Sequence, residues 1–126
     1  MAEAVVTLVA KKKMMKARAG AIALPKIVGM AFGNGGTDAS GNVITPVETQ
    51  TALNSELLRK EIDGYEFLSD TKCRYNCTLG SADLVGKYVS ELALYDEDGD
   101  ILAIKNFLQK GKDSDIEMTM MFDDEF

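Results

Sequence analysis

The amino-acid sequence predicts an α+β protein, with two helices in the N-terminal half and an antiparallel β-sheet or small sandwich after them. Three observations lead to this prediction: a lysine-rich helical segment near the start, a helix-capping signal at residue 45, and alternating apolar and polar residues in the second half. The chain has 126 residues, of which 46% are hydrophobic and 27% charged. This composition suits one globular domain over residues 1–126.

Two elements are expected before the first long loop. Residues 7–19 are rich in Ala, Leu, Lys, Met and Arg, which favour helices, and Gly20 supplies a natural end. Their apolar stripe is thin, so we expect a helix on the surface. Residues 22–32 predict a strand in which Val28, Met30 and Phe32 share one face. A glycine-rich loop over residues 33–42 follows this strand.

The second helix is predicted from a capping box. Thr45 and Glu48 can exchange hydrogen bonds with each other's backbone N–H groups, and Pro46 stands at the first helical position. The apolar residues that follow include pairs four residues apart, Leu53 with Leu57 among them. We therefore expect a helix from residue 45 through Leu53, extending at most to residue 62.

The second half predicts antiparallel strands. Residues 71–79 and 115–122 alternate between apolar and polar side chains, and residues 89–95 and 101–104 are expected to form two more strands, giving the order 71–79, 89–95, 101–104 and 115–122. Between the second and third of these strands lies Asp98-Gly99, the favoured centre of a type I′ hairpin turn. A two-residue turn there places Leu94 opposite Ala103 and Tyr95 opposite Leu102.

The residues that are missing exclude several kinds of enzyme. The chain has no histidine, which rules out Ser/His/Asp and Cys/His nucleophile systems and the common zinc sites. Its only cysteines, Cys73 and Cys77, lie four residues apart on a predicted strand, a separation of about 13 Å. A disulfide between them is therefore not expected, and both should be reduced. We expect no catalytic activity, cofactor or bound metal.

Two segments resemble ligand-binding motifs without matching them. The acidic turn at residues 96–100 suggests an EF-hand calcium loop. With Asp98 at its fifth position, however, Leu94 would be first and Lys105 twelfth, and neither can serve there. The glycines at 33–36 lack the lysine of a phosphate loop. An exposed hairpin turn and a flexible loop are the preferred interpretations.

Charge is distributed unevenly along the chain, although the net charge is −6. The first 30 residues are mainly basic, and every charged residue after Lys112 is acidic. The two regions could meet within one chain, meet between copies, or form two solvated faces. Nucleic-acid binding is not expected of an acidic chain with no aromatic residues among its lysines. The candidate partner-interface residues are Lys11, Lys12, Lys16, Arg18, Phe122 and Phe126.

Three segments resemble the N-terminal domain of contractile-phage tail fibres, the tail-collar fibre family. Residues 45–59 (TPVETQTALNSELLR) resemble the family stretch PTPxETQTALxNExYR, and residues 88–104 (YVSELALYDEDGDILAI) resemble the hairpin xxREIGLYDEDGDLIAI. Residues 27–36 (IVGMAFGNGG) correspond to KMAVGDGG. The chain departs from the family at Ser90, where arginine is usual, and at Ala93, where glycine is usual.

The resemblance implies a structural function. Such a domain attaches a fibre to the baseplate of a phage tail or tail-like particle, and the family contributes no catalytic residues. Fibres of the family are trimers, so we expect a homo-oligomer, most simply a trimer, with residues 1–20 and 113–126 near the interface. The expected partners are baseplate or fibre-shaft proteins. The expected location is the virion tail, after synthesis in the host cytoplasm, because the sequence predicts neither a signal peptide nor a membrane span.

Some alternatives stay open at this point. Members of the family usually continue into a long shaft, so this chain could be a separate fibre-base or baseplate protein, or a prophage remnant. A small-ligand or carbohydrate-binding module is the alternative function. It would use the loop at residues 33–42 and the acidic turn.

Overall fold

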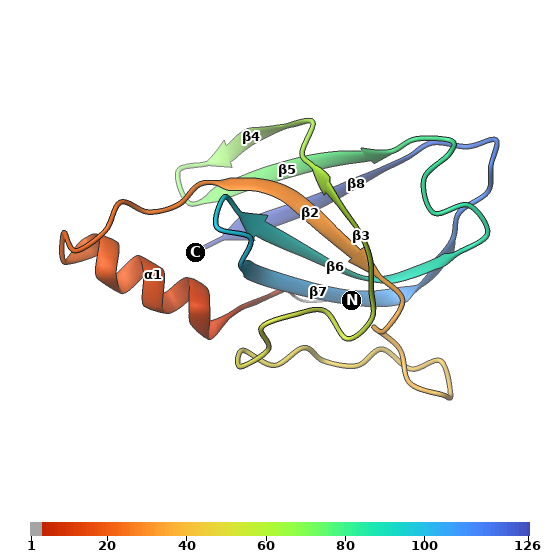
Figure 1. Cartoon of the computed structure of the whole chain (residues 1–126), viewed down its shortest axis with the longest axis horizontal. Helices are drawn as coiled ribbons and strands as arrows, with labels where there is room; N and C mark the ends of the chain where they lie inside the picture. Colours follow the sequence, from red (N-terminus) through yellow and green to blue (C-terminus); the bar gives the residue numbers. More distant parts are fainter. Residues whose placement is uncertain (1–3) are drawn as a thin grey trace.

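Two antiparallel sheets pack face to face in the computed structural model, which describes residues 4–126 (Figure 1). The strand orders are β1-β7-β6-β2-β3 and β4-β5-β8. Helix α1, Leu8–Arg18, lies beside one end of the sheets and is the one helix among the described residues. The strands are β1 Ala4–Val6, β2 Ile27–Gly33, β3 Glu56–Glu61, β4 Gly64–Ser69, β5 Lys72–Leu79, β6 Tyr88–Asp96, β7 Ile101–Gly111 and β8 Met118–Glu125. The α+β prediction is thus confirmed in outline, but its second helix was wrong.

The main core lies between the two sheets, because alternate residues of a strand point to the same face. Met30 and Phe32 of β2 are completely buried there, beside Leu92 and Leu94 of β6. Phe122 of β8 fills the same space from the three-stranded sheet. The predicted apolar face is confirmed for Met30 and Phe32, but a register shift between Ile27 and Gly29 brings Ile27, and not Val28, against this core.

A second, smaller core lies on the outer face of the five-stranded sheet. The long connection between β2 and β3, residues 34–55, runs along this face (Figure 1). Its Leu53 is buried against Ala31 of β2, Ala93 of β6 and Ile104 of β7. These small and branched side chains let the connection approach the sheet closely.

Helix α1 matches the predicted helix over residues 7–19 and has well-formed ends. The Thr7 hydroxyl accepts a hydrogen bond from the Ala10 N–H at 3.2 Å, which caps the N-terminus, and donates one to the Ile101 carbonyl of β7 at 2.8 Å. Gly20 has a φ of 79°, and its N–H bonds to the Ala17 carbonyl at 3.0 Å. This left-handed residue ends the helix, as the sequence predicted.

The helix predicted over residues 45–62 does not form. Its second half is strand β3, which pairs antiparallel with β2 so that Leu58 lies opposite Phe32. Leu58 of β3 and Ile62, the residue directly after the strand, pack against the main core. The pairs of apolar residues four apart therefore reflect burial in a sheet, where tertiary packing overrides helix propensity.

The capping-box residues make other contacts. The Gln50 side chain accepts from the Val47 N–H at 2.9 Å, and the Gln50 N–H donates to the Val47 carbonyl at 3.1 Å, so a local turn replaces the first helical turn. The Glu48 carbonyl accepts from the Leu8 N–H at 2.7 Å, and its carboxylate pairs with Lys11 of α1. Glu48 thus holds helix α1 against the connection instead of starting a second helix.

The hairpin between β6 and β7 has a three-residue loop, so the predicted type I′ turn was wrong. The Gly99 N–H donates to the Asp96 carbonyl at 2.8 Å, and Gly99 alone in the loop has a positive φ, 85°. This is a type I turn followed by a left-handed glycine, which forms a bulge. Leu94 pairs with Ala103 as predicted, but the bulge sets Tyr95 opposite Ile101.

Other strand limits also differ from the prediction. The strand expected from residue 22 begins at Ile27, after Pro25, which has no N–H group to donate to a sheet. The strand expected from 115 begins at Met118, and β7 continues to Gly111. Strand β5 lies where residues 71–79 predicted it, with both cysteines on its buried face. Strands β1 and β4 were not predicted. They are sheet edges whose short or exposed sequences carry no clear alternation.

Candidate functional site

Glu91 is a charged residue that is completely buried in the middle of β6. Its Oε2 accepts hydrogen bonds from the N–H groups of Gly35 at 2.9 Å and Ser55 at 2.7 Å, and its Oε1 accepts from the Asn54 N–H at 2.8 Å. A buried carboxylate is stable where such donors replace water. Glu91 therefore fastens both ends of the connection at residues 34–55 to the sheet.

The glycine-rich loop packs closely against β6 from the end of β2. A Cβ atom on Gly33 would collide with the Ser55 carbonyl and the Glu91 side chain, and one on Gly36 would collide with the Ser90 carbonyl. The Gly36 N–H donates to the Ser90 hydroxyl at 2.9 Å. The first part of the loop, expected to be flexible, is therefore held in place, and its glycines are explained by close packing.

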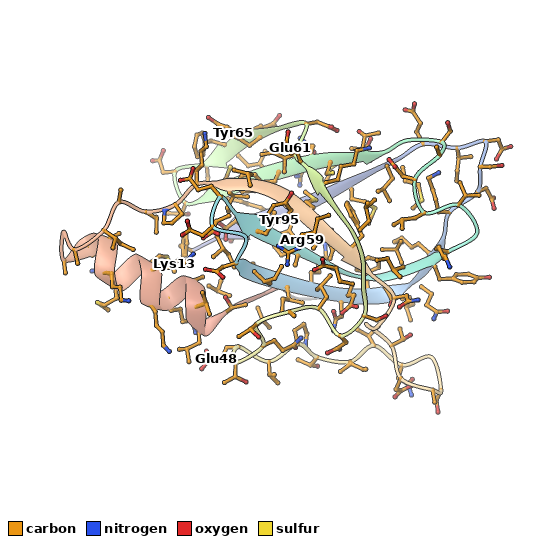
Figure 2. All side chains as sticks on the ribbon, in the orientation of Figure 1. Lys13, Glu48, Arg59, Glu61, Tyr65 and Tyr95 are labelled. Carbon is orange, nitrogen blue, oxygen red and sulfur yellow. The ribbon has the colours of Figure 1, made fainter. Side chains whose placement is uncertain are left out.

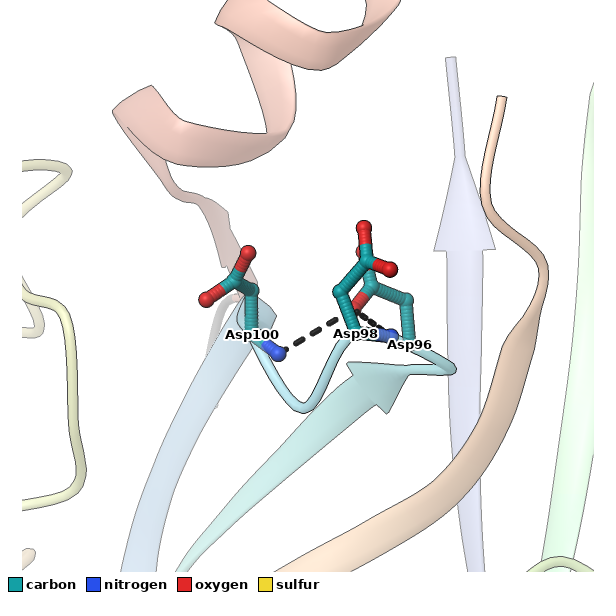
Figure 3. A group of neighbouring side chains, drawn as sticks. All are labelled: Asp96, Asp98 and Asp100. Carbon is teal, nitrogen blue, oxygen red and sulfur yellow. Dashed lines mark hydrogen bonds between the residues drawn. The ribbon is translucent and has the colours of Figure 1, made fainter. Parts of the chain in front are cut away.

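The acidic turn holds three carboxylates around one ammonium group. The side chains of Asp96, Asp98 and Asp100 offer oxygen atoms within 4.8 Å of one another. Lys13, from helix α1, places its Nζ 2.6 Å from Asp96, 3.1 Å from Asp98 and 2.6 Å from Asp100. Oδ1 of Asp96 also accepts the N–H groups of Asp98 at 3.0 Å and Asp100 at 3.1 Å (Figure 3).

Lys13 acts as the cation of this cluster. Burial opposes its charge, but hydrogen bonds to Asp100, Asp96 and Asp98 outweigh that effect and raise the pKa of Lys13. The ammonium group is thus firmly charged at neutral pH, and it ties α1 to the β6–β7 hairpin. The position that resembled a calcium site carries a structural ion pair, which supports the hairpin interpretation.

Arg59 of β3 holds the same hairpin from another side. Its Nη1 donates to the Gly99 carbonyl at 2.7 Å, and its guanidinium group lies 5.0 Å from the centre of the Tyr95 ring (Figure 2). Its Nε also donates to Glu56 at 2.9 Å. Contacts from α1 and from β3 thus fix the hairpin relative to both neighbours.

The four basic candidate residues all lie on helix α1. Lys11 pairs with Glu48, and both side chains are about half exposed. Lys12, Lys16 and Arg18 are exposed on the helix surface. These residues are therefore accessible to a partner, although they do not form one compact cluster with the two aromatic candidates.

The two aromatic candidates have opposite environments. Phe122 is completely buried between the sheets, so it packs the protein's own core and has no exposed surface for a partner. Phe126 is 73% exposed. Between them, Asp123 accepts two hydrogen bonds from Arg74 of β5, at 2.8 and 3.0 Å, which lower the pKa of Asp123. This part of the acidic tail thus pairs with β5 and not with the basic helix.

A groove of about 840 Å³ opens at the α1 end of the sandwich. Helix α1 and β7 contribute to one side of it, and β4, β5 and the end of β8 contribute to the other. Figure 2 labels Lys13 on α1 and Tyr65 on β4, which both line it. Asp124 lies in the groove, where loss of water raises the pKa of its carboxyl group.

Sequence reasoning did not single out three important residues. Glu91 carries a signal, since a carboxylate in the middle of a mostly apolar strand needs a specific partner. Lys13 belongs to a lysine run whose sign complements the acidic turn, but which lysine reaches the turn depends on how the helix packs. Asp124 follows the alternation of β8 and so faces inward. In the sequence it stands in an acidic run, which gives no sign that one of its members is partly buried.

The three segments that carry the family resemblance meet at Glu91. The glycine loop supplies Gly35, the connection supplies Asn54 and Ser55, and β6 supplies the carboxylate. Together they define the class of protein as a β-sandwich in which the three recognisable segments hold one another in place. Within residues 4–126, no helix has the length and apolar character needed to span a membrane.

The family model described as phage tail-collar fibre protein, N-terminal, matches residues 1–121. The chain belongs to this family, and the resemblance drawn from the sequence is confirmed. Membership gives it a structural role in a phage tail and makes it a component of the virion tail. Searches of curated proteins and of solved structures found no match.

Proposed function

We propose that this protein is a non-enzymatic attachment domain that joins a tail fibre to the baseplate of a phage tail or tail-like particle. The family match over residues 1–121 is the observation that carries the proposal. Two features support it: the connection at residues 34–55 is fastened to the sheet at both ends by Glu91, and the β6–β7 hairpin is held by Lys13 and Arg59. A domain that transmits force needs such fixed connections. A prophage remnant with the same role is included in this proposal.

The non-enzymatic part of the proposal is supported by how the polar residues are used. The chain has no histidine. Glu91 is saturated with backbone donors, and the aspartates of the acidic turn share the Lys13 ammonium group. These carboxylates therefore stabilise the fold through contacts within the chain.

The alternative, a small-ligand or carbohydrate-binding module, is less well supported. It would rely on the loop at residues 33–42 and on the acidic turn. The start of that loop, Gly35 and Gly36, is packed against Glu91 and Ser90, and the three aspartates of the acidic turn form ion pairs with Lys13. The glycine N–H groups and the carboxylates on which a ligand site would depend are therefore already used within the fold.

We further propose that the protein works as a homo-oligomer, most simply a trimer, that binds baseplate or fibre-shaft proteins and not nucleic acid. Matching the symmetry of a fibre is the reason for the trimer. The net charge of −6 argues against binding to phosphate backbones. Synthesis in the bacterial host cytoplasm, followed by incorporation into the tail, completes the proposal.

Deleting the gene from its phage or particle tests the proposed function. Purified particles should have sheathed tails and baseplates without fibres, as seen by electron microscopy, and a wild-type copy supplied in trans should restore the fibres. Antibody against the protein should label the baseplate end of wild-type tails. Fully fibred tails from the deletion strain would contradict the proposal.

A further inference from the structure

The inner face of the three-stranded sheet is left uncovered at the α1 end. Tyr65 and Phe67 of β4 pair directly with Tyr75 and Cys73 of β5, so all four side chains lie on the same face. Cys73 is buried and Tyr75 is partly buried against the core. Tyr65 and Phe67, however, are 61% and 74% exposed. Aromatic side chains that face a sandwich interior and remain exposed indicate a surface that a partner covers.

Phe126 extends this uncovered face across the sheet. It is 73% exposed and lines the groove together with Tyr65 and Phe67, whose rings meet edge to face with centroids 5.6 Å apart. The volume of about 840 Å³ is enough for several side chains of a partner. The groove is therefore an apolar docking surface with its aromatic residues already in position.

Asp124 gives the groove a specific requirement for charge. Its carboxylate lies beside Phe126 on β8, and burial is the one cause found for the raised pKa of this group, since no described donor or cation offsets it. A carboxylate that loses water without gaining a partner destabilises the isolated chain. An ammonium or guanidinium group from another molecule would remove that cost.

Helix α1 carries a row of side chains that matches this requirement. Leu8, Lys12 and Met15 are spaced at i, i+4 and i+7, so they share one face of the helix. This face points away from the sheet, since Ala10 and Lys13 make the inward contacts. Leu8 is 36% and Met15 64% exposed. The row is thus a lysine between two exposed apolar side chains.

We propose that the Leu8–Lys12–Met15 row of one copy packs into the groove of a second copy, with Lys12 paired to Asp124 and the apolar side chains against Tyr65, Phe67 and Phe126. The inference rests on the proposed function in one respect, the homo-oligomer. It deepens that proposal by naming the two surfaces. The row and the groove are different surfaces of one chain, as a ring-forming contact requires.

Charge reversal at the two ends of the pair tests this contact. The full chain is compared with Lys12→Glu, Asp124→Lys and the double variant by sedimentation velocity and native mass spectrometry. Each single change should weaken association by about tenfold or more, because it creates a pair of like charges in a partly buried place. The double variant reverses the pair and should regain association.

Two further variants separate this contact from general effects. Lys87→Glu makes the same charge change at an exposed position outside the groove and should leave association unchanged. Met15→Asp should weaken association while the chain still folds, because the side chain is mostly exposed and its loss removes no core packing. Thermal unfolding confirms that each variant is folded. If Asp124→Lys fails to fold, the association of Lys12→Glu and Met15→Asp is compared with that of the control Lys87→Glu, and this comparison still tests the contact.

Three results would overturn the inference. These are a monomeric wild-type chain at high concentration, a double variant no better associated than the single ones, or equal effects of Lys12→Glu and Lys87→Glu. An oligomer that ignores all these changes would remove the proposed contact and leave the homo-oligomer in place. Attachment to the baseplate is tested separately on particles, so the two failures are distinguishable.

Discussion

Replacing Lys13 with methionine should destabilise the protein strongly, because it removes the cation that pairs with the buried carboxylate of Asp96 and with two half-exposed ones. The Asp96 side chain is completely buried, and that of Lys13 is 15% exposed. Removing one partner of a buried pair costs about 3–5 kcal/mol. Asp96 keeps two backbone N–H donors, and Asp98 and Asp100 are about half exposed and can turn to water. We therefore expect a loss at the lower end, about 3 kcal/mol.

Urea unfolding followed by circular dichroism measures this loss, with Lys11→Met as the matched control. Both changes remove a lysine from the same helix, but Lys11 pairs with Glu48 where both side chains are about half exposed. An exposed pair of this kind contributes about 1 kcal/mol or less. If Lys13→Met lost no more stability than Lys11→Met, the cluster would not be a structural ion pair and the reasoning would be refuted.

Calcium gives a second measurement on the same pair of proteins. The unaltered chain should show no micromolar affinity for calcium or magnesium in calorimetry, because an ammonium group occupies the centre of the acidic turn. In Lys13→Met the three aspartates repel one another, and millimolar calcium should raise the melting temperature of that variant. A steep calcium-dependent rise in the unaltered protein would contradict the role of Lys13.

Three further predictions concern other contacts. Gly36→Ala should cost about 1–3 kcal/mol, because its Cβ meets the Ser90 backbone, whereas Gly64→Ala, which meets nothing within 4 Å, should cost much less; equal losses in urea unfolding would contradict close packing. Thiol titration in denaturant without reductant should find two free thiols. The native protein should react slowly, since burial raises the pKa of Cys77 to about 11; a missing thiol would indicate a bridge. Arg74 lowers the pKa of the Asp123 carboxyl group, so that pair stabilises the protein fully above about pH 4 and progressively less as the pH falls further. In Arg74→Met the melting temperature should therefore depend less on pH in the acid range, and an unchanged dependence would contradict this role of the pair.

The sequence predicted correctly those helices and strands whose form depends mainly on their own residues. Helix α1 was predictable because its composition favours a helix and Gly20 supplies the left-handed end. Strand β5 was predictable because its alternating sequence matches one buried face, and β6 because it is mostly apolar and leads into the Asp98-Gly99 turn. The family was recognisable from three short segments, since each is constrained by close packing that few other residues tolerate.

The prediction of a second helix was wrong because the capping box is a local pattern, whereas the contacts that compete with it join distant parts of the chain. Thr45 to Glu48 form a sound capping box in isolation, but Glu48 binds helix α1, and β3 pairs with β2 over residues 56–61. Those contacts join residues that are distant in sequence, and local propensity carries no information about them. The predicted hairpin register was wrong for a related reason, since the three-residue loop that ends at Gly99 and a further register shift between Leu94 and Tyr95 change which residues face each other.

By itself, the sequence determined the antiparallel second half, the first helix, the absence of histidine chemistry and the family, because these depend on residue type and short-range spacing. The tertiary structure alone decided that Glu91 holds the three family segments together and that Lys13 pairs with the aspartates of the acidic turn. It also left Asp124 among uncovered aromatic residues. The physical reason is that the packing of elements distant in sequence sets both the distance from a charged side chain to its partners and the extent of its burial.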